Sequence, residues 1–169
     1  MDQDRGRWNQ LMIERGLAAL ARAEAVGEPG PYGLQAAIAA CHARAVTAGG
    51  TDWIRIASLY DVLAGSSPSP VVELNRSVAH AMAFGAGAGL RLVDALMSEP
   101  SLTGYPYLPG VRGDFLFKLE RFDEARAEFE RAAALTRNAR QRELLLERAR
   151  ACEQMKAKCR APLQGCLSM

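Results

Sequence analysis

Glycine- and proline-rich breakers divide the chain into short segments, and this division limits the possible folds more than any other feature of the sequence. The breakers are GEPGP, GSSPSP, GAGAG and YPYLPG, together with the pair Gly49-Gly50. Between them, apolar residues recur at the three- and four-residue spacing of one helix face. Aromatic residues make up only 7% of the chain, alanine is abundant, and valine and isoleucine are few. This pattern predicts an all-α protein without strands, because a sheet needs more β-branched and aromatic side chains.

About eight helices are expected from this spacing and from the residues that can begin or end a helix. Pro31 and Pro70 suit the first turn of a helix. Thr51 or Asp52 can cap the helix that lies between those two. The stretch GAGAG at 85–89 lacks the spacing of a phosphate-binding loop and is expected to form a tight turn between helices. Four helices are expected in the first half of the chain, and they run from Asp4 to about Val26 with Trp8 and Met12 on the inner face, from Pro31 to Gly49, from Trp53 to Leu63, and from Pro70 to Met82 with Met82 on the inner face. Four more are expected in the second half, and they run from Leu90 to Met97, from YPYLPG to Leu119 with Leu119 facing inward, from Asp123 to Leu135, and from Asn138 to about Lys158.

The stretch GDFLFKLERFDEARAEFERAAAL indicates how these helices pack. Its small and aromatic residues fall where a tetratricopeptide (TPR) repeat has them, at Gly113, Phe117, Phe122, Ala125, Phe129 and Ala132. Gly113 and Ala125 would let the two helices of one hairpin touch. Short connections make consecutive helices antiparallel neighbours, so we expect stacked antiparallel hairpins in a TPR-like right-handed solenoid. Residues 1–160 would form this domain, and residues 161–169 would form a flexible tail.

The charge balance and the cysteines exclude several classes of protein. The net charge of +2 is too near neutral to predict nucleic-acid binding, although residues 137–160 hold eight Arg or Lys against three Glu. The simplest interpretation of that basic stretch is a solvated helix face. No segment approaches the ~20 apolar residues that a membrane span needs. Four cysteines without a signal peptide favour a reducing compartment, and therefore a cytoplasmic protein.

The residue types that could carry catalysis do not form a recognisable site in the sequence. Neither His42 nor His80 has a Cys, Asp or Glu three or four residues later, so both are interpreted as structural. No serine or cysteine lies in a nucleophile elbow, and no pair of carboxylates has catalytic spacing. The sequence therefore predicts a protein that is not an enzyme and that uses no metal and no cofactor.

Three cysteines near the end of the chain could suggest a metal site, but their spacing argues against it. Cys152, Cys159 and Cys166 recur every seven residues. On one helix this spacing places neighbouring thiols ~10 Å apart, which is too far for them to share one zinc ion. Cys152 and Cys159 are instead expected to be buried as small apolar residues, together with Leu145 and Met155.

Several polar and aromatic residues are explained neither by a solvated surface nor by an apolar core. They could bridge helix ends, caps and hairpins, since buried polar groups must find partners. Alternatively, they line the concave groove of a short solenoid, where a peptide or a neighbouring domain docks. These candidate interaction residues are Gln35, His42, Trp53, Tyr60, Asn75, Arg76, Arg112 and Asp114.

Taken in order, five parts of the sequence resemble a family of bacterial transcription proteins. They are DQDRGRWN, GPYGLQAAIAACHARA, TDW with LYDVL, PVVELNRSVAHAM and GLRLVDAL, and the resemblance covers residues 2 to about 152. The chain is similar there to the C-terminal TPR-like domain of extracytoplasmic-function (ECF) RNA polymerase sigma factors. The resemblance implies a regulatory domain that modulates transcription initiation, with the upstream sigma-factor domains and the RNA polymerase core as partners.

The resemblance also implies what this region would not do. It runs through DQDR, so we expect a domain boundary there, with sigma regions 2 and 4 upstream of Asp2. The helices that read the −10 and −35 promoter elements would belong to those upstream regions. We therefore expect no direct DNA binding by the residues of this chain.

Two other functions stay open on the sequence alone. A free-standing helical-repeat adaptor would bind a peptide from another protein, and the reading frame upstream of Asp2 would distinguish it from a sigma factor. A small-molecule sensor or enzyme would need a closed cavity between hairpins, lined by His42, Tyr60 or Arg112. Ligand-dependent melting would reveal such a cavity.

Overall fold

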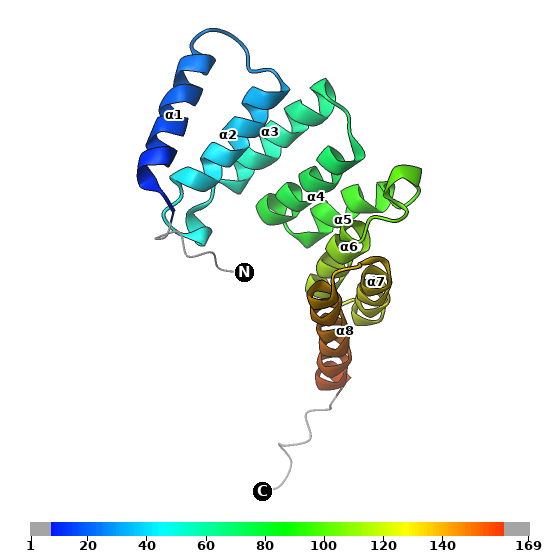
Figure 1. Ribbon diagram of the computed structural model, residues 1–169. Helices are drawn as coiled ribbons and strands as arrows, with labels where there is room; N and C mark the ends of the chain where they lie inside the picture. Colours follow the sequence, from blue (N-terminus) through cyan, green and yellow to red (C-terminus); the bar gives the residue numbers. More distant parts are fainter. Residues whose placement is uncertain (1–7, 161–169) are drawn as a thin grey trace, which may run out of the picture. The chain divides into compact units, whose positions relative to one another are not determined.

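A computed structural model describes residues 8–160, which form eight α-helices and two short 3-10 helices without a strand (Figure 1). The chain divides into two compact units, one ending at Gly85 and one beginning at Ala86. The helices of the first unit are α1 (Gln10–Glu24), α2 (Pro31–Arg44), η2 (Ala48–Gly50), α3 (Trp53–Ser66) and α4 (Pro70–Phe84). Those of the second unit are α5 (Ala86–Ala95), η3 (Pro100–Leu102), α6 (Tyr107–Lys118), α7 (Phe122–Leu135) and α8 (Ala139–Arg160).

Inside each unit, every helix packs against its neighbour in the chain. In the first unit α2 contacts α1 and α3, and α3 also contacts α4. In the second unit α6 contacts α5 and α7, and α7 also contacts α8. This arrangement of adjacent hairpins in chain order confirms the predicted all-α fold class. Within residues 8–160, none of the helices combines the length and the apolar character that crossing a bilayer requires.

Several helices begin at the residues that the sequence indicates. Pro31 and Pro70 are the first residues of α2 and α4, where the missing N–H of proline costs no helical hydrogen bond. Asp52 caps α3, and its Oδ1 accepts a hydrogen bond from the backbone N–H of Arg55 at 2.9 Å. These local signals confirm the predicted starts of α2, α3 and α4.

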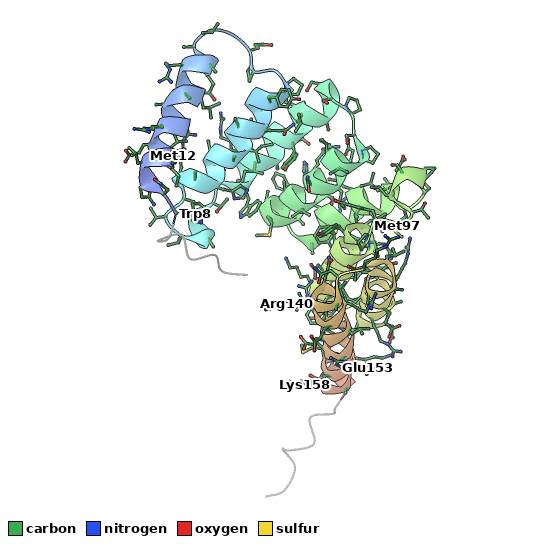
Figure 2. All side chains as sticks on the ribbon, in the orientation of Figure 1. Trp8, Met12, Met97, Arg140, Glu153 and Lys158 are labelled. Atoms are coloured by element: carbon green, nitrogen blue, oxygen red, sulfur yellow. The ribbon has the colours of Figure 1, made fainter. Side chains whose placement is uncertain are left out.

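The start of α1 differs from the prediction. Asn9 caps this helix, because its Oδ1 accepts a hydrogen bond from the backbone N–H of Met12 at 3.1 Å. Trp8 therefore precedes the helix, and its side chain is half-buried (Figure 2). The predicted helical residues before Trp8 lie outside the described part of the chain. Met12 was expected on the inner face but is 60% exposed, since the contact between α1 and α2 covers only a narrow face around Leu20.

The stretch GAGAG is mainly the start of a helix, which corrects the prediction of a turn. Gly85 alone separates α4 from α5, and its φ of 91° is a conformation that glycine adopts without strain. A single residue in this conformation is enough to end α4. The other four residues, Ala86 to Gly89, are consequently able to form the first turn of α5.

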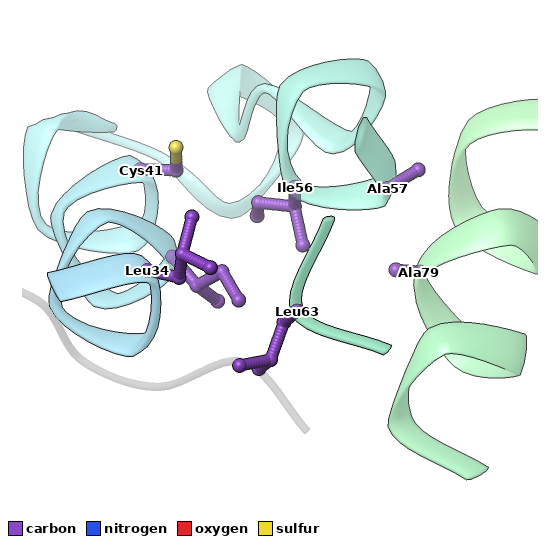
Figure 3. Packing of buried hydrophobic residues seen from close by; sticks show 7 residues of the cluster. Leu34, Cys41, Ile56, Ala57, Leu63 and Ala79 are labelled. Atoms are coloured by element: carbon purple, nitrogen blue, oxygen red, sulfur yellow. The ribbon is translucent and has the colours of Figure 1, made fainter. Parts of the chain in front are cut away.

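The core of the first unit lies between α2, α3 and α4 (Figure 3). Ile56 and Leu63 of α3 are each 1% exposed, and removing such a side chain from water contributes about 1.5–3 kcal/mol. Ala57 of α3 and Ala79 of α4 belong to the same cluster, and their small size permits a close approach of the two helices. The complete cluster consists of Leu34, Ile38, Cys41, Ile56, Ala57, Leu63 and Ala79.

The second unit has the close helix contact that the TPR-like pattern predicts. Gly113 of α6 faces Phe129 of α7 so closely that a Cβ atom on residue 113 would lie 2.9 Å from two carbons of the ring. Ala125 of α7 is fully buried. Phe117 and Phe122 meet edge to face, with ring centroids 5.4 Å apart. The close approach of the two helices that was predicted at Gly113 is therefore confirmed.

The turn between α6 and α7 explains why one predicted core residue is exposed. Leu119 was expected to face inward but is 39% exposed, because α6 ends at Lys118. Glu120 follows with a φ of 61° and donates its backbone N–H to the carbonyl oxygen of Phe117 at 3.0 Å. The N–H of Arg121 donates to the carbonyl oxygen of Leu116, and this second hydrogen bond completes a Schellman motif.

We expect Gly113→Ala to destabilise the protein by about 1–3 kcal/mol, because the added methyl group overlaps a buried ring. Gly16→Ala is the matched control, since Gly16 lies inside α1 with no atom within 4 Å of the new Cβ. Alanine at residue 16 should be neutral or stabilising by up to about 1 kcal/mol. Urea unfolding followed by circular dichroism measures both changes. Equal stability of the two variants would show that α6 and α7 are not in close contact.

Candidate functional site

A cluster of charged side chains links α3 to α4 in the first unit, and one of its members is the candidate residue Arg76. The Nε of Arg76 donates to Oδ1 of Asp61 at 2.6 Å, and its Nη1 donates to Oε2 of Glu73 at 3.1 Å. The same Oδ1 of Asp61 lies 2.9 Å from Nε2 of His80. A single carboxylate oxygen on α3 therefore holds two side chains of α4.

The pKa values in this cluster follow from these contacts. Burial raises the pKa of the Asp61 carboxyl, but the hydrogen bonds from Arg76 and His80 outweigh that effect and hold the pKa below its ordinary value. The hydrogen bond to Asp61 raises the pKa of the Arg76 guanidinium. Both groups are charged at neutral pH, so Arg76 acts first as a link between two helices.

The aromatic candidates of the first unit are packing residues. The His42 ring of α2 meets the Trp53 ring of α3 nearly at right angles, with centroids 5.2 Å apart. Trp53 and Tyr60 are half-buried and pack against the core cluster of this unit. Burial raises the pKa of the Tyr60 phenol, so this side chain stays neutral at physiological pH. These three residues help to join α2 to α3.

The other two candidates of the first unit, Gln35 and Asn75, have exposed side chains. Asn75 lies on α4 between Val71 and Met82, which are 43% and 45% exposed. The spacings of four and seven residues place all three side chains on one face of the helix. Met82 was expected to face inward, and its exposure corrects that prediction. Of the eight candidates, Asn75 is the one best placed to meet a partner, because it lies among exposed apolar side chains.

Arg112 joins three helices of the second unit. Its Nε donates to Oδ1 of Asp94 on α5 at 2.7 Å, and its Nη1 donates to Oε1 of Glu128 on α7 at 2.9 Å. The second carboxylate oxygen of Glu128 is buried without a hydrogen bond, 3.7 Å from Nη1 of Arg131. The side chains of Arg112 and Glu128 are only 18% and 12% exposed, so water and salt screen this pair weakly.

Asp114 links α6 to α8. Its Oδ1 lies 2.6 Å from Nη1 of Arg148. The guanidinium of Arg148 also lies over the ring of Phe129, 5.4 Å from the centroid. Farther along α8, Lys156 donates to Oδ2 of Asp123 on α7 at 2.6 Å. Part of the basic stretch 137–160 therefore pairs with carboxylates of neighbouring helices and is not simply a solvated face.

α7 and α8 form a groove along the C-terminal half of α8. Its volume is about 410 Å³, and Phe122 and Cys152 contribute to its lining. A smaller hollow of about 230 Å³ shares Phe122 with this groove and extends to Cys159. The grooves on this hairpin contain none of the three residues proposed for a closed cavity, which are His42, Tyr60 and Arg112.

The cysteines of α8 differ from one another in burial. Cys152 is 1% exposed, as expected, and burial raises the pKa of its thiol. Cys159 is exposed and Met155 is 37% exposed, which corrects the prediction that both are buried. α7 begins at Phe122, opposite the penultimate turns of α8, so little of α7 extends far enough to cover Cys159. Cys166 lies outside the described residues.

The side chains that could bind a metal do not form a metal site in the described residues. Among residues 8–160, no group of three His, Cys, Asp or Glu side chains could hold a metal ion. The partners of Arg76, Arg112 and Asp114 favour the interpretation that these three residues bridge helices. The sequence missed the contact of His80 with Asp61, because a search three or four residues along one helix does not reach a partner 19 residues away.

Comparison with known proteins identifies a relative of this chain. The chain is similar to an uncharacterized protein of Rhizobium meliloti (strain 1021), with 48% identity over 138 residues. The matched region covers 82% of this chain but 32% of that protein, so the chain spans about a third of the length of this relative. No family model and no solved structure matches the chain.

We expect Arg112→Met to destabilise the protein by about 3 kcal/mol, because it leaves the largely buried carboxylate of Glu128 without its main partner. Arg126→Met is the matched control. Arg126 also contacts two carboxylates, Glu130 and Glu153, but all three side chains are 45–58% exposed. Its replacement should cost about 0–1 kcal/mol. Urea unfolding at low and high salt checks this difference, and equal losses would show that the Arg112 pair is fully solvated.

The ion pairs of Asp61 should make stability depend on pH in the acid range. Because the folded-state pKa of Asp61 is lowered, its contribution is fully present above the ordinary carboxyl pKa and is lost as pH falls through the folded-state pKa. We expect the wild-type protein to be more stable than Asp61→Asn at neutral pH and the difference to shrink on acidification. Urea unfolding at a series of pH values measures it. A constant difference would show that Asp61 is not preferentially stabilised as the anion.

Proposed function

We propose that this chain is a regulatory, protein-interaction domain of an ECF-type sigma factor that modulates transcription initiation. One observation carries the proposal: 82% of the chain matches only 32% of its Rhizobium relative. A similar region therefore occurs in a protein that has additional sequence over most of its length. The resemblance of the segments from DQDRGRWN to GLRLVDAL supports the sigma-factor assignment, and the stacked hairpins suit a domain that binds other proteins.

The mode of action that we propose is docking within the full-length protein. A domain fused to its partner acts at a high effective concentration, so a small contact surface is sufficient. The exposed face of α4 around Asn75 offers such a surface, because Val71 and Met82 supply apolar area beside an amide that can donate and accept hydrogen bonds. The partners in this proposal are the upstream sigma-factor domains and the RNA polymerase core.

In this proposal Arg76, Arg112 and Asp114 hold neighbouring helices together and do not themselves contact the partner. Each makes an ion pair with a neighbouring helix of its own unit. Replacing any of them would disturb helix packing as well as a surface, and so would not test docking cleanly. Asn75 makes no side-chain hydrogen bond or ion pair with another described residue, so its replacement leaves the packing of α4 intact.

In vitro transcription with purified RNA polymerase core tests the proposal. The full-length protein would be compared with a version that lacks the residues of this chain and with Asn75→Arg. We expect the deletion and Asn75→Arg to change promoter-dependent transcription in the same direction, because both remove the same contact. Gln154→Arg is the matched control, since Gln154 is an exposed polar residue of α8 and the same charge is added.

Each result has a separate meaning. If the full-length protein does not bind the polymerase core, the sigma-factor assignment is wrong and a free-standing peptide-binding adaptor takes its place. If it binds but the deletion leaves transcription unaltered, the regulatory role is wrong. If the deletion acts and Asn75→Arg does not, with thermal unfolding unchanged, the face of α4 around Asn75 is not the docking surface.

A further inference from the structure

One side of α8 carries exposed apolar side chains together with two cations. Arg140, Leu144, Ala151, Met155 and Lys158 follow one another at spacings of three, four or seven residues, which places them on the same side of a helix. The side chains of Leu144 and Met155 are 50% and 37% exposed. These five residues are called the α8 face below.

The two cations lie at the ends of the α8 face. Arg140 and Lys158 are 18 residues apart, which corresponds to five turns of an α-helix and about 27 Å along its axis (both are labelled in Figure 2). Neither side chain forms an ion pair or a hydrogen bond with another residue in the range 8–160. By contrast, Arg148 and Lys156 of the same helix pair with carboxylates of α6 and α7. Arg140 and Lys158 are therefore available to a partner.

α6 extends this surface. Tyr107, Asp114 and Lys118 lie on one side of α6, because they are seven and four residues apart. Asp114 pairs with Arg148, which follows Leu144 of the α8 face by four residues, so the two helix sides adjoin at this ion pair. Tyr107 is 53% exposed. Lys118 is exposed and pairs with no carboxylate of the described part of the chain.

The combined surface of α6 and α8 is basic. Its unpaired cations among the described residues are Arg140, Lys158 and Lys118, whereas the ion pair that joins the two helices is neutral. Glu147 lies at the far edge of the α8 face, three residues after Leu144. Three positive charges and one negative charge leave a balance of +2. The surface consequently favours an acidic partner.

The apolar side chains indicate that this partner is a protein. Leu144, Met155 and Tyr107 supply apolar area between the cations, and such an arrangement of an apolar centre and a charged rim is typical of protein–protein interfaces. Interfaces with nucleic acids are more polar and much more positively charged. A balance of +2 along about 27 Å is small for binding a phosphate backbone.

We propose that the α6–α8 surface binds an amphipathic helical segment of a partner protein that is acidic near both ends and apolar between them. A helix of about 18 residues has the length of the α8 face, and it can pack along α8 as the helices of this protein pack along one another. Its carboxylates would pair with Arg140 and Lys158, and its apolar side chains would cover Leu144 and Met155. This inference concerns the second unit and is independent of the sigma-factor assignment.

Fluorescence anisotropy with a synthetic peptide tests this inference. The probe is a labelled helical peptide of about 18 residues, with glutamates in its first and last turns and leucines along one side. The full chain should bind it, and rising salt should weaken the binding. We expect Arg140→Glu/Lys158→Glu to weaken binding by about tenfold or more, because like charges then face each other. Leu144→Ser/Met155→Ser should weaken it without a change of charge, because apolar contact is lost.

Arg91→Glu/Arg150→Glu is the matched control, because it changes the net charge by the same amount. Arg91 is an exposed residue of α5, and Arg150 is exposed about 120° around α8 from Leu144. The affinity of this control should equal that of the parent, and a loss as large as that of Arg140→Glu/Lys158→Glu would overturn the proposal. Failure of the parent chain to bind the peptide would also overturn it. Thermal unfolding checks that every variant is folded.

Two further measurements exclude other occupants of the surface. If a single-stranded DNA oligonucleotide binds more tightly than the peptide and Arg140→Glu/Lys158→Glu abolishes that binding, the surface belongs to a nucleic acid and the proposal is wrong. Sedimentation equilibrium of the chain alone measures self-association. A dimer that Leu144→Ser/Met155→Ser dissociates would assign the surface to a second copy of the chain instead.

Discussion

The contact between Gly113 and the ring of Phe129 sets the distance between α6 and α7, and the polar contacts of the second unit depend on it. The residues on either side of Gly113 are Arg112 and Asp114, and the residue before Phe129 is Glu128. Because the two helices meet closely at the glycine, the guanidinium of Arg112 can reach the Glu128 carboxylate at 2.9 Å. A side chain at residue 113 would push the helices apart and lengthen this ion pair, which is expensive for a largely buried carboxylate.

Charged side chains join helices in both units. In the first unit Asp61 holds Arg76 and His80 of the next helix, and in the second unit Asp114 holds Arg148 over an aromatic ring. These ion pairs are directional, so they fix the relative position of neighbouring helices. The alanine-rich core alone would do this less well, because its small side chains interlock little. Residues that combine charge with partial burial are for this reason poor markers of a binding surface in this protein.

The exposed surfaces that carry apolar area have a different character. The face of α4 around Asn75 and the groove beside Cys152 both combine apolar area with few unpaired charges. Such surfaces suit contacts within one chain or with an attached domain, where effective concentration replaces a large buried area. The docking that we propose for the face of α4 around Asn75 is of this kind.

The sequence by itself determined the starts of α2, α3 and α4 and the α6–α7 contact, because prolines, caps such as Asp52 and small residues such as Gly113 act over a few residues of one or two adjacent helices. Only the tertiary structure decided which charged side chains pair, since partners such as Asp61 and His80 lie on different helices, 19 residues apart. It also decided exposure at the ends of the hairpins. Periodicity shows which face of a helix is apolar, whereas the length of the neighbouring helix decides how far along that face the cover extends, as Cys159 shows.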